Sequence, residues 1–66
     1  MYENDIIATI EETALDYVRM HGVMPDKVSL RQDEYKAYKE QYNKGNKPRI
    51  LFKGEVKTVE AVLMRG

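Results

Sequence analysis

Cysteine is absent from this 66-residue chain. Without it the chain forms no disulfide and offers no thiolate to a metal. There is a single histidine, His21, so a zinc site would depend mainly on carboxylates, which is uncommon. A domain of this length buries a small core, and small folds usually gain support from disulfides, a metal or a second chain. We therefore expect self-association, as a homodimer, to supply that support.

Residues that carry enzyme chemistry are equally scarce. The single serine, Ser29, has no histidine near it in the sequence, and a serine nucleophile requires a base within hydrogen-bond reach. His21 falls at the end of a predicted helix, where it packs or caps more often than it catalyses. No phosphate-binding loop, dinucleotide fingerprint or metal-spaced cluster is present. We expect no enzyme activity, no cofactor, no bound metal and no small-molecule substrate.

Long hydrophobic runs are also lacking. No apolar stretch approaches the length of a membrane span, and the first residues are acidic where a secretory signal would be basic. Hydrophobic residues make up 42% of the chain and charged residues 33%, a balance typical of a folded rather than a disordered protein. We expect one small domain over residues 1–66, with no membrane association and a cytoplasmic location.

The net charge is zero, but the charges are unevenly distributed. Residues 1–26 carry six acidic side chains and one arginine, whereas residues 27–66 carry ten basic and five acidic side chains. Two interpretations stay open. Either the two parts attract each other, within one chain or between two, or the basic part binds an acidic partner.

Apolar spacing predicts two helices. Apolar side chains recur every three or four residues over residues 3–21, with Asn4 or Asp5 as the helix cap and Gly22 as the stop. Residues 32–43 form the second predicted helix, because acidic residues begin it and lysines follow. Three tyrosines share one face of this second helix: Tyr35, Tyr38 and Tyr42.

Three strands complete the predicted fold. Residues 27–31 alternate between polar and apolar, residues 49–53 are largely apolar, and residues 56–64 are rich in valine. A tight turn is predicted at Gly54-Glu55. The order helix, strand, helix, strand, strand predicts an α+β domain in two layers, with two helices on one face of a three-stranded sheet. We expect homodimerisation through an exposed sheet edge or through the first helix.

The stretch "YKAYKEQYNKGNKPRILFKG", residues 35–54, combines the tyrosines with closely spaced basic residues. A nucleic-acid interpretation uses the lysines to contact phosphates and the aromatic rings to stack on bases. The alternative is that the tyrosines attach the second helix to the sheet, since they are its only large apolar groups. We favour packing for the tyrosines, while the basic loop stays a contact surface in either case. The candidate partner-binding residues are Lys44, Lys47, Arg49, Lys53, Lys57, Tyr38 and Tyr42.

One pattern resembles a known family. Residues 21–42, "HGVMPDKVSLRQDEYKAYKEQY", and the later "ILFKGEVKTV" are similar to an α/β unit of tailed-phage major capsid proteins. The matching positions are Gly22, Pro25, Val28, Leu30, Tyr35, Phe52, Gly54 and Val56. The chain is far too short to be a capsid subunit. The resemblance implies a small protein of phage or prophage type that acts in the host cytoplasm, and it carries over no functional residue.

These observations predict a small non-enzymatic interaction protein that binds and modulates a macromolecular partner, with a host or phage protein favoured. The alternative is a nucleic-acid-binding module that uses the basic loop and hairpin at residues 44–57.

Overall fold

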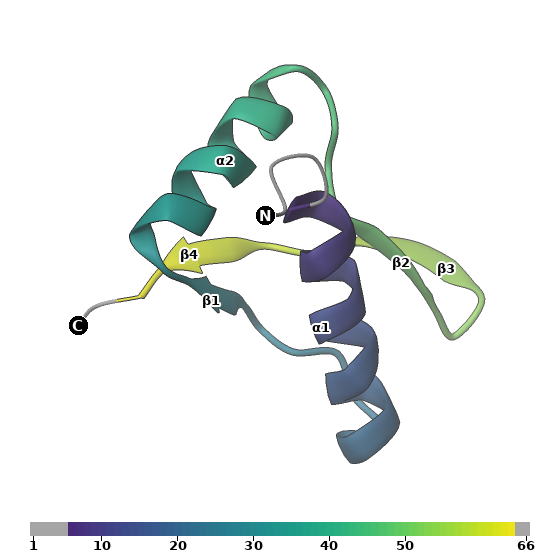
Figure 1. Ribbon diagram of the computed structural model, residues 1–66. Coiled ribbons are helices and arrows are strands. Elements are labelled where there is room, and N and C mark those ends of the chain that lie inside the picture. Colours follow the sequence, from purple (N-terminus) through teal and green to yellow (C-terminus); the bar gives the residue numbers. More distant parts are fainter. Residues whose placement is uncertain (1–5, 65–66) are drawn as a thin grey trace.

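The structure is a computed structural model that describes residues 6–64 (Figure 1). Two helices and four short strands lie within this part of the chain, which confirms the predicted α+β class. The elements are α1 (Ile6–His21), β1 (Val28–Leu30), α2 (Gln32–Asn43), β2 (Arg49–Phe52), β3 (Glu55–Thr58) and β4 (Ala61–Leu63).

Helix α1 is held by one apolar face. Ile6, Ile10 and Ala14 recur at steps of four and are all 0% exposed, as the periodicity predicts. The helix ends at His21, and the next residue, Gly22, adopts φ 74° and donates its N–H to the carbonyl of Val18 at 2.7 Å. The predicted start at residue 3, with its cap at residue 4 or 5, lies outside the described residues.

The predicted three-stranded sheet is wrong, because the strands form two separate pairs. β1 pairs in parallel with β4, with Val28 opposite Ala61, whereas β2 and β3 form an antiparallel hairpin. The predicted last strand, 56–64, is divided between β3 and β4 at Val59 and Glu60. Val59 is 2% exposed and donates its N–H to the carbonyl of Pro48 at 2.8 Å. Beyond Val59 the chain leaves the hairpin and joins β1, where the carbonyl of Glu60 accepts a hydrogen bond from the N–H of Val28 at 2.9 Å.

The hairpin turn is one residue earlier than predicted. Its two central residues are Lys53 and Gly54, both with positive φ, at 52° and 81°. Two such residues define the type I′ turn, whose twist suits a two-residue hairpin loop. Glu55 therefore belongs to β3, where it lies opposite Phe52.

The core lies between the helices and the strands. α1 contacts β1 and β2, α2 contacts β1 and β4, and the two helices contact each other. Figure 1 shows the β2–β3 hairpin extending to one side of this body, past α1. The buried core residues are Ile6, Ile10, Ala14, Val28, Leu30, Tyr38, Ile50, Val59 and Ala61.

Candidate functional site

The three tyrosines of α2 form a row of contacting rings. The ring centroids of Tyr35 and Tyr38 are 5.8 Å apart, and those of Tyr38 and Tyr42 are 5.6 Å apart, both in tilted arrangements. Tyr38 is 8% exposed and belongs to the core, and the rings line a small cavity with Ala61 of β4. Tyr38 therefore offers little surface to a partner, whereas Tyr42 is 39% exposed.

The environment of Tyr38 favours the neutral phenol. Burial raises the pKa of Tyr38, and the neighbouring Tyr42 hydroxyl raises it further. A hydrogen bond with the backbone of Ala61 acts in the opposite direction and is outweighed. This phenol is a structural group that stays protonated at neutral pH.

Lysines cover several of the aromatic rings. The Nζ of Lys47 lies 5.3 Å from the ring centroid of Tyr42, and the Nζ of Lys39 lies 5.9 Å from that of Tyr35. Such cation–π contacts contribute on the order of 0.5–1 kcal/mol at exposed sites. A nucleic-acid base that stacked on the same face of Tyr42 would first have to displace Lys47.

The loop after α2 is closed by hydrogen bonds to the helix. The backbone N–H of Asn46 donates to the carbonyl of Gln41 at 2.9 Å, and the Asn46 amide donates to Gln41 Oε1 at 2.8 Å. Gly45 adopts φ 93° and donates to the carbonyl of Tyr42 at 3.0 Å. These bonds fix the path of the chain from the helix end to β2.

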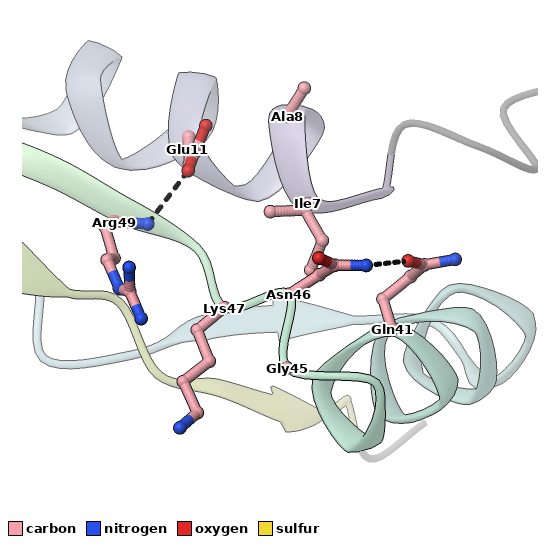
Figure 2. Close-up of a pocket in the computed structure, with 8 residues that line it drawn as sticks. All are labelled: Ile7, Ala8, Glu11, Gln41, Gly45, Asn46, Lys47 and Arg49. Carbon is pink, nitrogen blue, oxygen red and sulfur yellow. Dashed lines mark hydrogen bonds between the residues drawn. The ribbon is translucent and has the colours of Figure 1, made fainter.

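Side chains alternate in direction between the loop and β2, so the basic side chains of Lys47 and Arg49 lie on the same side of the backbone. Pro48 is buried, whereas Lys47 and Arg49 on either side of it are exposed. Figure 2 shows both of their side chains extending away from α1. The backbone N–H of Arg49 points the other way and donates to Glu11 Oε2 at 2.9 Å. Glu11 thus fixes the backbone from which these two cations project.

An open hollow lies between α1 and this loop (Figure 2). Its lining combines Ile7, Ala8 and Glu11 of α1 with polar residues of the loop. Glu11 Oε2, Gln41 Oε1 and the Asn46 amide N–H each take part in a hydrogen bond within the chain. The hollow therefore lies where α1 and the loop are held together. The exposed side chains of Lys47 and Arg49 lie at its margin.

Most of the predicted contact cations form no ion pair with the described acidic residues. Of the five, only Lys57 forms an ion pair in residues 6–64, with Glu55 at 3.0 Å. Two further ion pairs join Arg19 to Asp16 and Arg31 to Glu34. Four unpaired cations remain along one segment of ten residues, and we refer to them as the basic strip: Lys44, Lys47, Arg49 and Lys53.

An apolar pair lies beside the basic strip. Leu51 and Val56 are directly opposite each other in the hairpin and are 67% and 68% exposed. They share their face of the hairpin with Arg49, because side chains alternate along a strand. Sequence reasoning missed this pair, since the continuous apolar run over residues 50–52 does not show which face is buried. Only the burial of Ile50, at 5% exposed, settles that Leu51 faces outward.

The residues considered for catalysis are dispersed. Ser29 lies in β1 opposite Val62, and His21 lies at the end of α1, where its ring centroid is 4.4 Å from that of Tyr17. Across residues 6–64, no three His, Asp or Glu side chains are grouped closely enough to hold a metal ion. In the same part of the chain, neither helix has the length and apolar character needed to cross a bilayer.

Comparison with known proteins finds no relative. No protein-family profile matches the chain, and no curated protein or solved structure matches it significantly. The functional argument therefore depends on the surface itself.

Proposed function

We propose that this protein is a non-enzymatic interaction domain that binds an acidic protein partner and modulates it. The contact surface is the basic strip together with the apolar pair Leu51 and Val56. The observation that carries the proposal is that the largely exposed Leu51 and Val56 share a hairpin face with Arg49, one of four cations that lie within ten residues and form no ion pair in residues 6–64. A partner segment with both carboxylates and apolar side chains complements such a surface, since the cations steer it and apolar burial retains it.

A protein partner is favoured over nucleic acid by the state of the aromatic rings. Non-specific binding of single strands depends on exposed rings on which bases stack. Here Tyr38 is buried, and Lys47 lies over Tyr42. Leu51 and Val56 have no role against a phosphate backbone. The unpaired cations alone support the second candidate, a nucleic-acid-binding module, and the experiment below separates the two.

The setting of this activity follows from the chain's composition and its resemblance. A cysteine-free chain is compatible with the cytoplasm, where we place its action. The phage or prophage type stays a prediction of the resemblance to the capsid unit, with a host or phage protein as the partner.

The test measures two ligands on one set of variants. The first ligand is a synthetic peptide that alternates Glu with Leu, and the second is a labelled oligonucleotide, single- or double-stranded, at low and moderate salt. We expect the unmodified chain to bind the peptide and not the oligonucleotide. The double variant Lys47→Glu/Arg49→Glu should lose peptide binding through charge, and Leu51→Thr should weaken it through lost apolar contact.

A matched control distinguishes the effect of charge at the basic strip from the effect of the net charge of the chain. The double variant Lys27→Glu/Lys36→Glu makes the same change in net charge at exposed positions outside the strip, and it should bind the peptide normally. Oligonucleotide binding that falls steeply with salt and survives Leu51→Thr would establish the nucleic-acid module instead, because neutralised phosphates release counterions. Equal loss of peptide binding in the control would show that net charge, and not this surface, is responsible.

A further inference from the structure

The outer edge of β3 has no strand beside it in residues 6–64. β3 pairs with β2 alone, and all four of its residues are exposed. An unpaired edge presents backbone N–H and C=O groups that another strand can use. We propose that β3 pairs with β3 of a second copy of this chain, antiparallel, with the two Val56 residues opposite each other at a two-fold axis.

The hairpin determines which backbone groups of β3 are free. In a two-residue hairpin the residues flanking the turn, Phe52 and Glu55, form a hydrogen-bonded pair. Hydrogen-bonded and non-hydrogen-bonded pairs then alternate along the ladder. Glu55 and Lys57 consequently direct their backbone groups toward β2, while Val56 and Thr58 direct theirs outward. Val56 can therefore exchange two backbone hydrogen bonds with Val56 of a second copy.

The charges of β3 favour this register over those centred on residues 55 and 57. With Val56 opposite itself, Glu55 of each copy lies opposite Lys57 of the other, so both cross-strand pairs attract. Shifting the centre of symmetry to residue 57 places Lys57 opposite Lys57, and shifting it to residue 55 places Glu55 opposite Glu55. Like charges directly opposite each other are destabilising in a sheet. A two-fold axis that passes between two residues is excluded as well. It would place a residue whose backbone N–H and C=O groups point outward opposite a residue whose groups point toward β2.

The same register assembles the exposed apolar residues. Leu51 and Val56 lie on one face of the hairpin, so pairing two hairpins forms a row of four apolar side chains across a four-stranded sheet. The existing ion pair between Glu55 and Lys57, at 3.0 Å, becomes part of a network of four charges. A lone lysine on an edge normally discourages pairing, but here each lysine meets a glutamate.

The structure favours this edge over the other predicted route to a homodimer, through the first helix. The apolar face of α1 is already used inside the chain, since Ile6, Ile10 and Ala14 are 0% exposed. The β3 edge keeps its apolar and hydrogen-bonding groups accessible without any rearrangement of the core. Self-association through this edge does not depend on the binding of an acidic partner, and the two proposals fail separately.

Complementary charge reversal tests both the interface and its register. In sedimentation equilibrium, the unmodified chain should approach twice its 7.7 kDa mass as its concentration rises into the millimolar range. Glu55→Lys and Lys57→Glu should each remain at the monomer mass, because each places like charges opposite each other. A one-to-one mixture of these two variants should regain the doubled mass, since all opposed pairs then attract.

Controls keep the test decisive. Glu12→Lys and Lys36→Glu reverse the same charges at exposed positions outside β3, and should associate like the unmodified chain. Circular dichroism should show both β3 variants folded, because the side chains of Glu55 and Lys57 are 70% and 45% exposed. Val56→Pro is a second route to the monomer: it removes the outward N–H without breaking a bond to β2, on an edge strand where proline is tolerated.

Three results would overturn the inference. They are an unmodified chain that stays monomeric at millimolar concentration, single variants that keep the doubled mass, and a mixture that stays monomeric. Monomeric protein that still binds the acidic peptide would overturn self-association alone.

Discussion

The carboxylate of Glu11 accepts a hydrogen bond from the backbone N–H of Arg49 at 2.9 Å, across 38 residues of sequence. This bond ties the middle of α1 to the first residue of β2. It satisfies a backbone donor at the start of the strand, and it sets the direction in which the Arg49 side chain leaves the body (Figure 2). An acidic residue of the first helix thus positions the basic strip without forming an ion pair with any of its side chains in the described part of the chain.

Removing this carboxylate should weaken the fold modestly. We expect Glu11→Ala to lower the free energy of unfolding by about 1 kcal/mol, the usual net contribution of one partly exposed hydrogen bond. Glu11→Gln keeps an acceptor oxygen and should lose less. Urea unfolding followed by circular dichroism measures both variants, and an unchanged m value would show that only stability changed. Equal stability of the alanine variant would mean that water replaces the carboxylate at no cost.

The centre of α1 should tolerate no charge. Ile10 is 0% exposed, so Ile10→Asp would place a carboxylate in the core without a partner. We expect this variant to be unfolded at room temperature. Burying an unpaired carboxylate costs several kcal/mol, which exceeds the free energy of unfolding of so small a domain. Ile10→Val, which removes one methylene group, should cost about 0.5–1.5 kcal/mol and stay folded. A folded aspartate variant in circular dichroism would contradict the assignment of this face to the core.

The hairpin turn leaves room for stabilisation. Lys53 adopts φ 52°, a left-handed conformation that costs most L-residues about 1–2 kcal/mol and that asparagine tolerates better. Lys53→Asn would create the Asn-Gly pair preferred in type I′ turns, and we expect it to raise the free energy of unfolding by up to about 1 kcal/mol. Gly54→Ala, at φ 81°, should lower it by a similar amount. Thermal unfolding of the two variants should therefore shift in opposite directions.

Alkaline pH should destabilise the fold through Tyr38. The folded chain raises the pKa of Tyr38 above its unfolded value of about 10. The resulting stability is fully present below pH 10, and is lost as the pH rises through the higher folded pKa. We expect the free energy of unfolding of the unmodified chain to fall more steeply above pH 10 than that of Tyr38→Phe. Tyr17→Phe makes the same substitution at a 40% exposed position and is the matched control for the loss of a phenol.

The described parts of both helices could be derived from the sequence because their signals are local. Isoleucines at steps of four and a following glycine define α1 within one stretch of chain. The tyrosine spacing likewise defines the buried face of α2, on which Tyr38 enters the core. The basic loop was also readable, since a proline and a glycine interrupt the helix among lysines. No distant contact is needed to recognise these features.

Strand pairing was not readable, since it depends on contacts between distant residues. Val56, Val59 and Val62 belong to one stretch rich in β-branched residues. In the structure Val56 lies in β3, Val59 in the connection between the strands, and Val62 in β4. Val28 of β1 pairs with Ala61, and this parallel partner draws β4 away from the hairpin. The two-sheet arrangement follows because the chain leaves the hairpin after β3 and pairs with β1 instead, where the N–H of Val28 donates to the carbonyl of Glu60 at 2.9 Å.

The sequence by itself determined the α+β class, both helices and the position of the basic residues, because composition and helical periodicity act over a few residues. Only the tertiary structure decided that Leu51 and Val56 face outward, that Glu11 anchors Arg49, and that no strand within residues 6–64 pairs with the outer edge of β3. Those features depend on which distant segments compete for the same buried volume, and that competition is resolved only when the whole chain packs.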